Sequence, residues 1–154
     1  VVGGFNRLDI RGVNDQTLAD KWVNGPRTHL GMQVSGFPNL FMLVGPHNAA
    51  SFCNIPRCIE QNVEWVSDLV DFMTAKGLAT VDATLAAEEE WTEHVYQSAE
   101  RMLLTKVDSW FNGINSNIPG RQTRNFLLYA AGAPAYREKC DTVAGNGYSG
   151  MSFE

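Results

Sequence analysis

The sequence predicts an α/β fold, and three observations favour this class. Residues 40–44 are five consecutive apolar residues, which fits a central strand buried on both faces of a sheet. From Ile59 onward, apolar residues recur at intervals of three and four, as they do on the buried face of a helix. A glycine-proline break, Gly45-Pro46, lies between the two segments, so the order is strand, loop and helix.

Size and charge set limits on the class of protein. The chain has 154 residues, 44% of them hydrophobic and 19% charged, which is ordinary for one globular domain. A net charge of −5 without a Lys/Arg run argues against nucleic-acid or anionic-membrane partners. No apolar run approaches the roughly 18 residues of a membrane span. The chain begins VVGGFN without an initiator methionine, and we therefore expect a fragment.

Cysteine and histidine usage predicts neither disulfides nor a metal site. Three cysteines, an odd number without CxxC spacing, are expected to be reduced thiols in a cytoplasmic protein. The three histidines lie far apart, and His94 lacks the second histidine of an HExxH motif.

The first fifty residues predict short elements. Residues 8–11 alternate apolar and charged side chains and predict a strand. Thr17 is expected to cap a short helix that runs through Trp22 and stops at Gly25-Pro26. Residues 29–34 are expected to be extended, and Phe37-Pro38-Asn39 is expected to turn the chain into the strand at 40–44.

The helix that follows is the most strongly indicated element. Asn54 is a favourable N-cap, and Pro56 fits the first turn because its missing N–H would have had no helical partner. Lys76 and Gly77 supply the cation and the glycine that typically end a helix.

The second half of the chain predicts alternating elements. We expect a strand at 78–82, a helix at 85–103 capped by Thr84, a strand at 126–129 and a helix at 134–143. Residues 88–90 are three glutamates, interpreted as a solvated face near the positive end of the second helix. Residues 109–125 are rich in Gly, Asn and Pro, and an irregular loop of this length is more often functional than idle.

The start of the long helix is the candidate binding site. A helix N-terminus beyond the end of a buried strand places partial positive charge in a crevice, where α/β proteins bind ligands. The small residues Ala49, Ala50 and Ser51 would let a flat, electron-rich group approach the backbone. An ordinary capped helix behind a surface loop is the alternative. His47 is expected to be an exposed loop residue rather than a proton carrier. No GxGxxG, P-loop or GxSxG motif is present, and no self-sufficient set of catalytic residues is visible.

Several runs resemble the carboxy-terminal third of Baeyer–Villiger monooxygenases of the cyclohexanone and phenylacetone monooxygenase type. In chain order they are GGFNRLDIRG, LADKWVNGPRTHLGMQVSGFPNLFMLVGP, NIPRCIEQNVEWVSD, DSWFNG, IPGR and YREKCDTVAGNGYSG. The resemblance implies that residues 1–154 are the carboxy-terminal segment of a Rossmann-like FAD-binding domain: its last sheet strand, helices and a wrapping tail.

The resemblance also implies an activity. These enzymes use FAD, NADPH and O2 to convert a ketone to an ester or lactone through a flavin C4a-peroxide. The glycine-rich cofactor motifs and the arginine that assists the reaction lie upstream of the matched region. We therefore expect the ketone, O2 and the remainder of the enzyme as partners, no catalytic residue in this chain, and no activity of the chain alone.

Particular residues match particular parts of the family's site. By resemblance, Gly45 and Pro46 form the break that passes close to the flavin, and Asn54 and Ile55 form the helix start that faces its pyrimidine edge. Three consecutive residues match the border of the substrate pocket, namely Ser51, Phe52 and Cys53.

A second match concerns NADP. Trp110 corresponds to a tryptophan on a mobile loop, at about 105–125, that covers the bound nucleotide and hydrogen-bonds its ribose; Asn115 and Asn117 could add polar contacts. Two departures from the family pattern affect pocket shape and loop closure. Residues 47–50 lack a second proline that many members have, and the run at 113–120 is two residues longer than usual.

Two other readings remain open at this level. One is a related class B flavin monooxygenase that oxygenates nitrogen or sulfur. The other is a free-standing, non-catalytic α/β domain that binds a ligand or a partner.

Overall fold

The computed structural model describes residues 2–5, 7–49, 53–114 and 124–154. In these segments helices dominate, and the paired strands are short. The order is α1 (Val2–Phe5), η1 (Val13–Asp15), α2 (Leu18–Lys21), α3 (Ile55–Lys76), β1 (Val81–Ala83), α4 (Leu85–Ala99), η3 (Leu103–Lys106), η4 (Trp110–Asn112), α5 (Gly132–Gly145) and β2 (Met151–Phe153).

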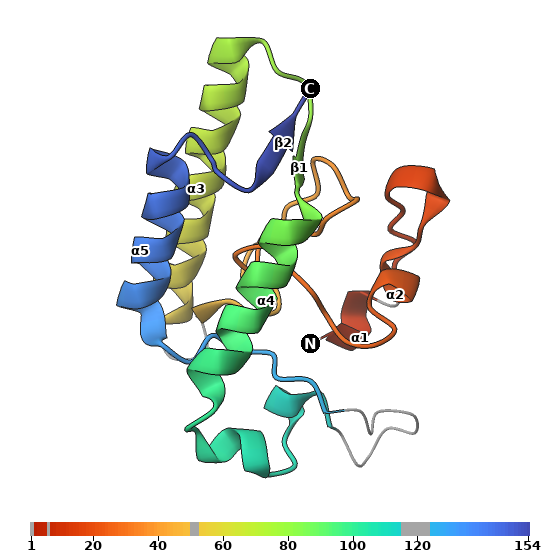
Figure 1. Cartoon of the computed structure of the whole chain (residues 1–154), viewed down its shortest axis with the longest axis vertical. Helices are drawn as coiled ribbons and strands as arrows, with labels where there is room; N and C mark the ends of the chain where they lie inside the picture. The colour runs from red at the N-terminus through yellow and green to blue at the C-terminus, as the bar shows by residue number, and fades with distance from the viewer. Residues whose placement is uncertain (1, 6, 50–52, 115–123) are drawn as a thin grey trace.

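The three long helices form the body of the molecule. Helices α3 and α5 run side by side, and α4 is drawn to one side of this pair, at an angle to it (Figure 1). The indole N–H of Trp65 on α3 donates to the carbonyl of Cys140 on α5 at 3.0 Å. β1 and β2 pair antiparallel, with Val81 opposite Phe153, and tie the end of the chain to the segment before α4.

Two apolar clusters hold these elements together. The larger one joins α3, α4, α5 and residues 126–129 and includes Trp65, Leu69, Trp91, Val95 and Tyr129. The smaller one fixes α2 to residues 34–42 and consists of Leu18, Trp22, Val34, Phe37 and Met42. The loops of the first fifty residues therefore have a core of their own.

The predicted threonine caps and the predicted end of the long helix α3 are confirmed. Thr17 Oγ1 accepts a hydrogen bond from the Asp20 amide at 3.1 Å, and Thr84 Oγ1 accepts one from the Ala87 amide at 3.2 Å. Helix α3 ends at Lys76, and Gly77 adopts the left-handed conformation with φ of 67°. Helix α5 extends past the predicted 134–143 at both ends.

The predicted buried strand at 40–44 is wrong. Residues 40–42 are irregular and residues 43–44 form a turn; Leu43 is 49% exposed, and Val44 has a φ of 58°. A strand needs a hydrogen-bonded neighbour, whereas here a single backbone bond joins Met42 to Met32. A short apolar run can also pack as a loop against a core, and this run does so in the smaller cluster.

The other predicted strands are also shorter or absent. Residues 8–11 contribute a single bridge, from Arg11 to Thr17. Residues 29–34 form a tight turn that is closed by a bridge from His29 to Gln33. Residues 126–129 contribute a single parallel bridge, from Leu128 to Asn48. The strand expected at 78–82 is β1, and the helix expected to reach residue 103 ends at Ala99. The α/β class thus holds in its element content, with helices far outweighing strands.

Glu88 is not part of a solvated face. Its side chain is fully buried; Oε1 accepts from the Ser35 amide at 2.9 Å, and Oε2 lies 3.0 Å from Lys21 Nζ. Helix α2 carries Lys21 to Glu88 on α4. The sequence of α4 alone could not reveal this partner. No helix of the described segments is both long enough and apolar enough to cross a lipid bilayer.

Candidate functional site

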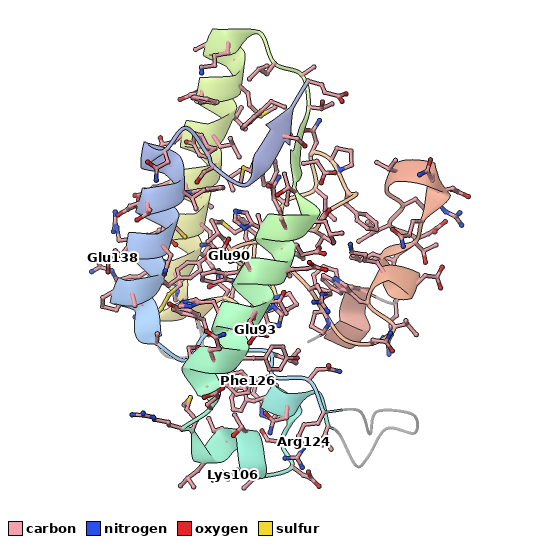
Figure 2. The ribbon with its side chains drawn as sticks, viewed as in Figure 1. Glu90, Glu93, Lys106, Arg124, Phe126 and Glu138 are labelled. Atoms are coloured by element: carbon pink, nitrogen blue, oxygen red, sulfur yellow. A yellow bond between two sulfur atoms is a disulfide. The ribbon has the colours of Figure 1, made fainter. Side chains whose placement is uncertain are left out.

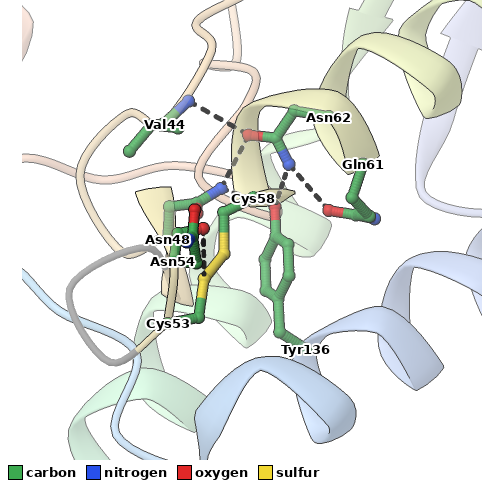
Figure 3. The surroundings of a disulfide bond; sticks show 8 residues. All are labelled: Val44, Asn48, Cys53, Asn54, Cys58, Gln61, Asn62 and Tyr136. Atoms are coloured by element: carbon green, nitrogen blue, oxygen red, sulfur yellow. Dashed lines mark hydrogen bonds between the residues drawn. A yellow bond between two sulfur atoms is a disulfide. The ribbon is translucent and has the colours of Figure 1, made fainter. Parts of the chain in front are cut away.

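A buried polar network joins the loop that leads to α3 to helices α3 and α5 (Figure 3). Asn62 Oδ1, on α3, accepts hydrogen bonds from the Val44 amide and from Asn48 Nδ2, each at 3.0 Å. Asn48 Nδ2 also donates to the Tyr136 hydroxyl at 2.7 Å. These contacts fix both ends of residues 44–48 to the helices beneath.

Tyr136 is the centre of this network. Its hydroxyl accepts from Asn62 Nδ2 at 3.2 Å and donates to the Leu30 carbonyl at 2.7 Å. The side chain is completely buried, and this burial raises the pKa of Tyr136 well above 10.0. The hydroxyl therefore stays protonated and serves as an anchor, joining α5 to the loop and to the turn at 29–33.

Two glycines allow the loop and that turn to touch through their backbones. A Cβ on Gly45 would lie 2.5 Å from the Gly31 carbonyl oxygen. A Cβ on Gly31, which has a φ of 66°, would lie 2.9 Å from both the Asn48 amide nitrogen and the Pro46 carbonyl oxygen. No other residue type fits at either position without moving the backbone. Gly45-Pro46 is thus a sharply defined break, as the sequence predicted.

His47 is buried, and its expected exposure is wrong. Its ring is fully covered, and Nδ1 lies 3.2 Å from Thr28 Oγ1, which also donates to the Pro46 carbonyl at 3.2 Å. The His47 amide donates to the Leu127 carbonyl at 2.9 Å, which turns the residue inward. Burial lowers the pKa of His47 from 6.5 to about 4, so the imidazole is neutral at neutral pH.

The start of α3 presents uncapped backbone. Asn54 is the N-cap residue but forms no side-chain capping bond, and the first turn contains no acidic residue. Asn54 and Ile55 are both exposed. Within the described segments the N–H groups at this end have no capping side chain, so they and the partial positive charge of a 22-residue helix can attract an electron-rich group.

Cys53 and Cys58 are joined by a disulfide, so the expectation of reduced thiols is wrong for these two cysteines (Figure 3). Cys140 is a free, buried thiol, as expected. The first turn of α3 brings Cys58 back over the residue that precedes the N-cap, which the spacing in the sequence did not suggest. Cys53 directly precedes Asn54, the N-cap residue of α3. Ser51 and Phe52, the other predicted pocket residues, lie outside the described residues.

Trp110 lies on a short turn with its ring in solvent. The side chain is 57% exposed and stacks on Phe111, with ring centroids 4.1 Å apart. Its indole N–H forms no hydrogen bond within the described segments. The turn is fixed from inside by the Asn112 side chain, whose Nδ2 donates to the carbonyls of Leu104 and Val107. Asn115 and Asn117 fall outside the described residues.

Residues 126–129 connect the Trp110 turn to the loop before α3. The Leu127 amide donates to the Phe111 carbonyl at 3.0 Å, and the Leu127 carbonyl accepts from the His47 amide at 2.9 Å. One residue thus bonds to both segments. Of the predicted site residues, the structure fixes Gly45 and Pro46 to the same framework as the Trp110 turn, with Asn54 and Ile55 at the end of the helix behind.

The sequence interpretation missed the polar residues that build this framework. Asn62 lies between Cys58 and Trp65 on the buried face of α3, and a lone amide in an apolar stripe was a usable signal. Asn48 and Tyr136 gave no comparable signal, because their partners are 14 to 106 residues away. No cluster of three or more His, Cys, Asp or Glu side chains among the described residues could hold a metal ion.

The chain is similar over nearly its whole length to known monooxygenases. No family model matches the chain. It is 41% identical over 99% of its length to the 2-oxo-Delta(3)-4,5,5-trimethylcyclopentenylacetyl-CoA monooxygenase of Pseudomonas putida. It is 39% identical over 98% to the phenazine N-monooxygenase PhzNO1 of Lysobacter antibioticus, and 35% identical over 98% to a Baeyer–Villiger monooxygenase of Pseudooceanicola batsensis. The chain spans 27–28% of the length of these relatives.

Solved structures give the same result. The whole chain superposes on a crystal structure of OTEMO in complex with FAD and NADP with a TM-score of 0.89 at 40% identity. It also superposes on cyclohexanone monooxygenase from Rhodococcus sp. Phi1 bound to NADP+, with a TM-score of 0.92 at 35% identity. It covers 28% of each of those chains. Along its whole length the chain is thus homologous to part of the Baeyer–Villiger monooxygenases of the cyclohexanone monooxygenase type.

Proposed function

We propose that this chain is the carboxy-terminal portion of the Rossmann-like FAD-binding domain of a Baeyer–Villiger monooxygenase that uses FAD and NADPH. The reaction consumes a ketone, O2, NADPH and a proton, and yields an ester or lactone, NADP+ and water. One observation carries the proposal: similarity in sequence and structure extends over the entire chain to a protein whose crystals hold FAD and NADP.

The start of α3 fits the flavin chemically. When bound, FAD supplies the oxygen-activating redox chemistry, and its reduced ring carries negative charge near the pyrimidine edge. Asn54 and Ile55 would direct the uncapped, positive end of the helix towards that edge. The absence of an acidic residue in the first turn removes a competing negative charge.

Gly45 and Pro46 would place backbone close to the ring and keep it there. The polar network under the loop and the tight contact with Gly31 hold this backbone in one position. A fixed contact surface has little freedom to lose when the cofactor binds. Cys53, together with Ser51 and Phe52, would border the ketone pocket.

Trp110 would cover bound NADP. Its indole N–H is a single donor on a large flat ring, and it is exposed and unpaired with any described residue. Bonding to a ribose hydroxyl would satisfy that donor. The hydrogen bonds of Leu127 join the turn of Trp110 to the loop of Pro46, so the nucleotide and flavin contacts would share one support.

A second candidate reaction is oxygenation of nitrogen. The phenazine N-monooxygenase from Lysobacter antibioticus is 39% identical over nearly the whole chain, scarcely less than the relative at 41%. Overall identity in this segment therefore does not separate the two reactions.

Product analysis of the natural protein tests the proposal. The protein is supplied with FAD, NADPH and isotopically heavy dioxygen, and with cyclic ketones or phenazine in parallel. We expect a lactone that carries one heavy oxygen for each NADPH consumed. Formation of an N-oxide alone would favour the second reaction. A protein that binds no FAD and consumes no NADPH would support a non-catalytic binding domain instead.

A further inference from the structure

We propose that the Cys53–Cys58 disulfide is a redox-controlled tether that positions the start of α3 and that a dithiol reductant breaks. The disulfide joins the residue before the N-cap to the first turn of the helix, five positions later. Figure 3 shows it next to Asn54 and close to the polar network around Asn62. Redox control of the helix start follows from the disulfide alone, whereas its effect on ketone binding rests on the proposed function.

The two ends of the tether are held to different degrees. Cys58 is 6% exposed and shares the buried face of α3 with Asn62 and Trp65. Those two side chains bond to the Val44 amide and to a carbonyl of α5, so this part of the helix is anchored in the core. Cys53 is only half-buried. Breaking the disulfide would therefore release Cys53 and leave Cys58 in place.

The disulfide takes the place of a side-chain cap. Asn54 forms no capping bond, and the helix begins with the backbone bond from the Cys58 amide to the Asn54 carbonyl at 3.2 Å. Helix α4 differs, because its N-cap Thr84 accepts a side-chain bond from the Ala87 amide. A cap fixes the residues that enter a helix. In α3 the covalent link has this role, and its loss would return backbone freedom to the residues before the helix.

Reduction is an exchange between the disulfide and a dithiol. A thiolate of the reductant attacks the sulfur of Cys53, the less buried of the two, and forms a mixed disulfide. The Cys53–Cys58 bond breaks, and Cys58 leaves as a thiolate and takes up a proton. The second thiol of the reductant then displaces Cys53. The dithiol ends as a disulfide, and the protein has gained two electrons and two protons.

The state of the tether should affect how the ketone binds. Cys53 would border the ketone pocket, and Asn54 and Ile55 would face the flavin, so all three would depend on a fixed helix start. A border that has regained freedom must lose it again when the ketone binds, which weakens binding. We expect reduction to raise the KM for the ketone at least threefold and to change kcat less than twofold.

Peptide mapping of the natural protein tests whether the tether forms. Trypsin cleaves after Arg27, Arg57 and Lys76, so the disulfide would link two separate peptides, residues 28–57 and 58–76. The protein is prepared without reductant, and its free thiols are blocked before digestion. We expect the linked pair in this sample and two unlinked peptides after treatment with dithiothreitol.

Hydrogen exchange then tests whether the tether positions the helix start. Amides in the first turn of α3 should exchange at least threefold faster after reduction. The double variant Cys53→Ser/Cys58→Ala should match the reduced protein in exchange and in KM, and dithiothreitol should not change it further. This comparison separates the tether from any other cysteine. Cys53→Ser alone, which keeps the buried Cys58, should give the same result.

Three results would overturn the inference. The first is the absence of the linked peptides from the unreduced protein. The second is equal exchange in the oxidised, reduced and variant proteins. The third is an equal ketone KM in both states of a protein that makes the lactone, which would leave the disulfide as a structural crosslink. A protein that makes neither lactone nor N-oxide would instead refute the proposed function, and the peptide map and the exchange rates would still decide on redox control.

Discussion

Removal of one buried hydroxyl should loosen the loop that carries Gly45 and Pro46. In Tyr136→Phe the buried Leu30 carbonyl loses its donor, at a cost of about 1–3 kcal/mol. The side-chain amides of Asn48 and Asn62 lose one acceptor but keep other partners, which adds about 1 kcal/mol. We therefore expect a total loss of roughly 2–4 kcal/mol. For a chain of this size, a loss of about 3 kcal/mol lowers Tm by roughly 6–12 °C.

Tyr129→Phe is the matched control. Tyr129 is equally well buried, but among the described residues its hydroxyl has a single partner, His94 Nε2 at 3.0 Å, and we expect a loss of about 1 kcal/mol. Urea unfolding followed by circular dichroism gives both values, and amide hydrogen exchange at Val44 and His47 reports on the loop directly. The role assigned to Tyr136 would be refuted if its variant lost no more stability than Tyr129→Phe, or if exchange at Val44 and His47 did not accelerate.

Four further predictions concern two buried groups, one exposed tryptophan and the isolated chain. Between pH 6.5 and pH 4 His47 is protonated in the unfolded chain but stays neutral in the folded one. The free energy of unfolding should therefore fall by about 3 kcal/mol as the pH is lowered through this range. His47→Gln should flatten this part of the pH profile measured by urea unfolding. Lys21→Met leaves the buried Glu88 carboxylate without its cation and should lower the free energy of unfolding by about 3–5 kcal/mol at neutral pH. The loss should be smaller in acid, because burial raises the pKa of Glu88 and the carboxyl group then becomes neutral. A second change, Glu88→Gln, should restore most of the lost free energy. Trp110→Ala in the natural protein should raise the KM for NADPH at least fivefold with a change in unfolding free energy within about 0.5 kcal/mol, and unchanged steady-state kinetics would contradict the assigned role. The 154-residue chain alone should not bind FAD tightly, because it lacks a glycine-rich phosphate motif; a yellow purified chain with a flavin spectrum would disprove this.

The elements that could be predicted from the sequence are those whose determinants are local. The extent of α3 follows from its apolar period, from Pro56 in the first turn and from Gly77 after the last. The Thr17 and Thr84 caps are likewise set by residues three positions away. Such contacts leave a readable pattern because the interacting groups are close in the chain.

The loops could not be predicted because their determinants are distant. Whether residues 40–44 form a strand depends on a neighbouring strand, and the structure instead supplies a smaller apolar cluster and a turn. The burial of His47 depends on Thr28 and Leu127, and that of Glu88 on Lys21. Apolar or charged character alone does not reveal such partners. For the same reason, family resemblance rather than local pattern indicated the candidate cofactor contacts.

The arrangement of these distant contacts explains why the candidate site can be both irregular and firm. Residues 44–48 have no ladder of backbone bonds, yet Asn62, Tyr136 and Thr28 hold them from three separate segments. Loop backbone fixed in this way can approach a flat ring closely, which a strand flanked by side chains could not do as readily. The cost is dependence on a few buried groups. A change at Tyr136 should therefore weaken the proposed flavin contact of the loop while leaving the exposed start of α3 intact. A change at Trp110 should instead weaken NADP binding and leave the loop at residues 44–48 unchanged.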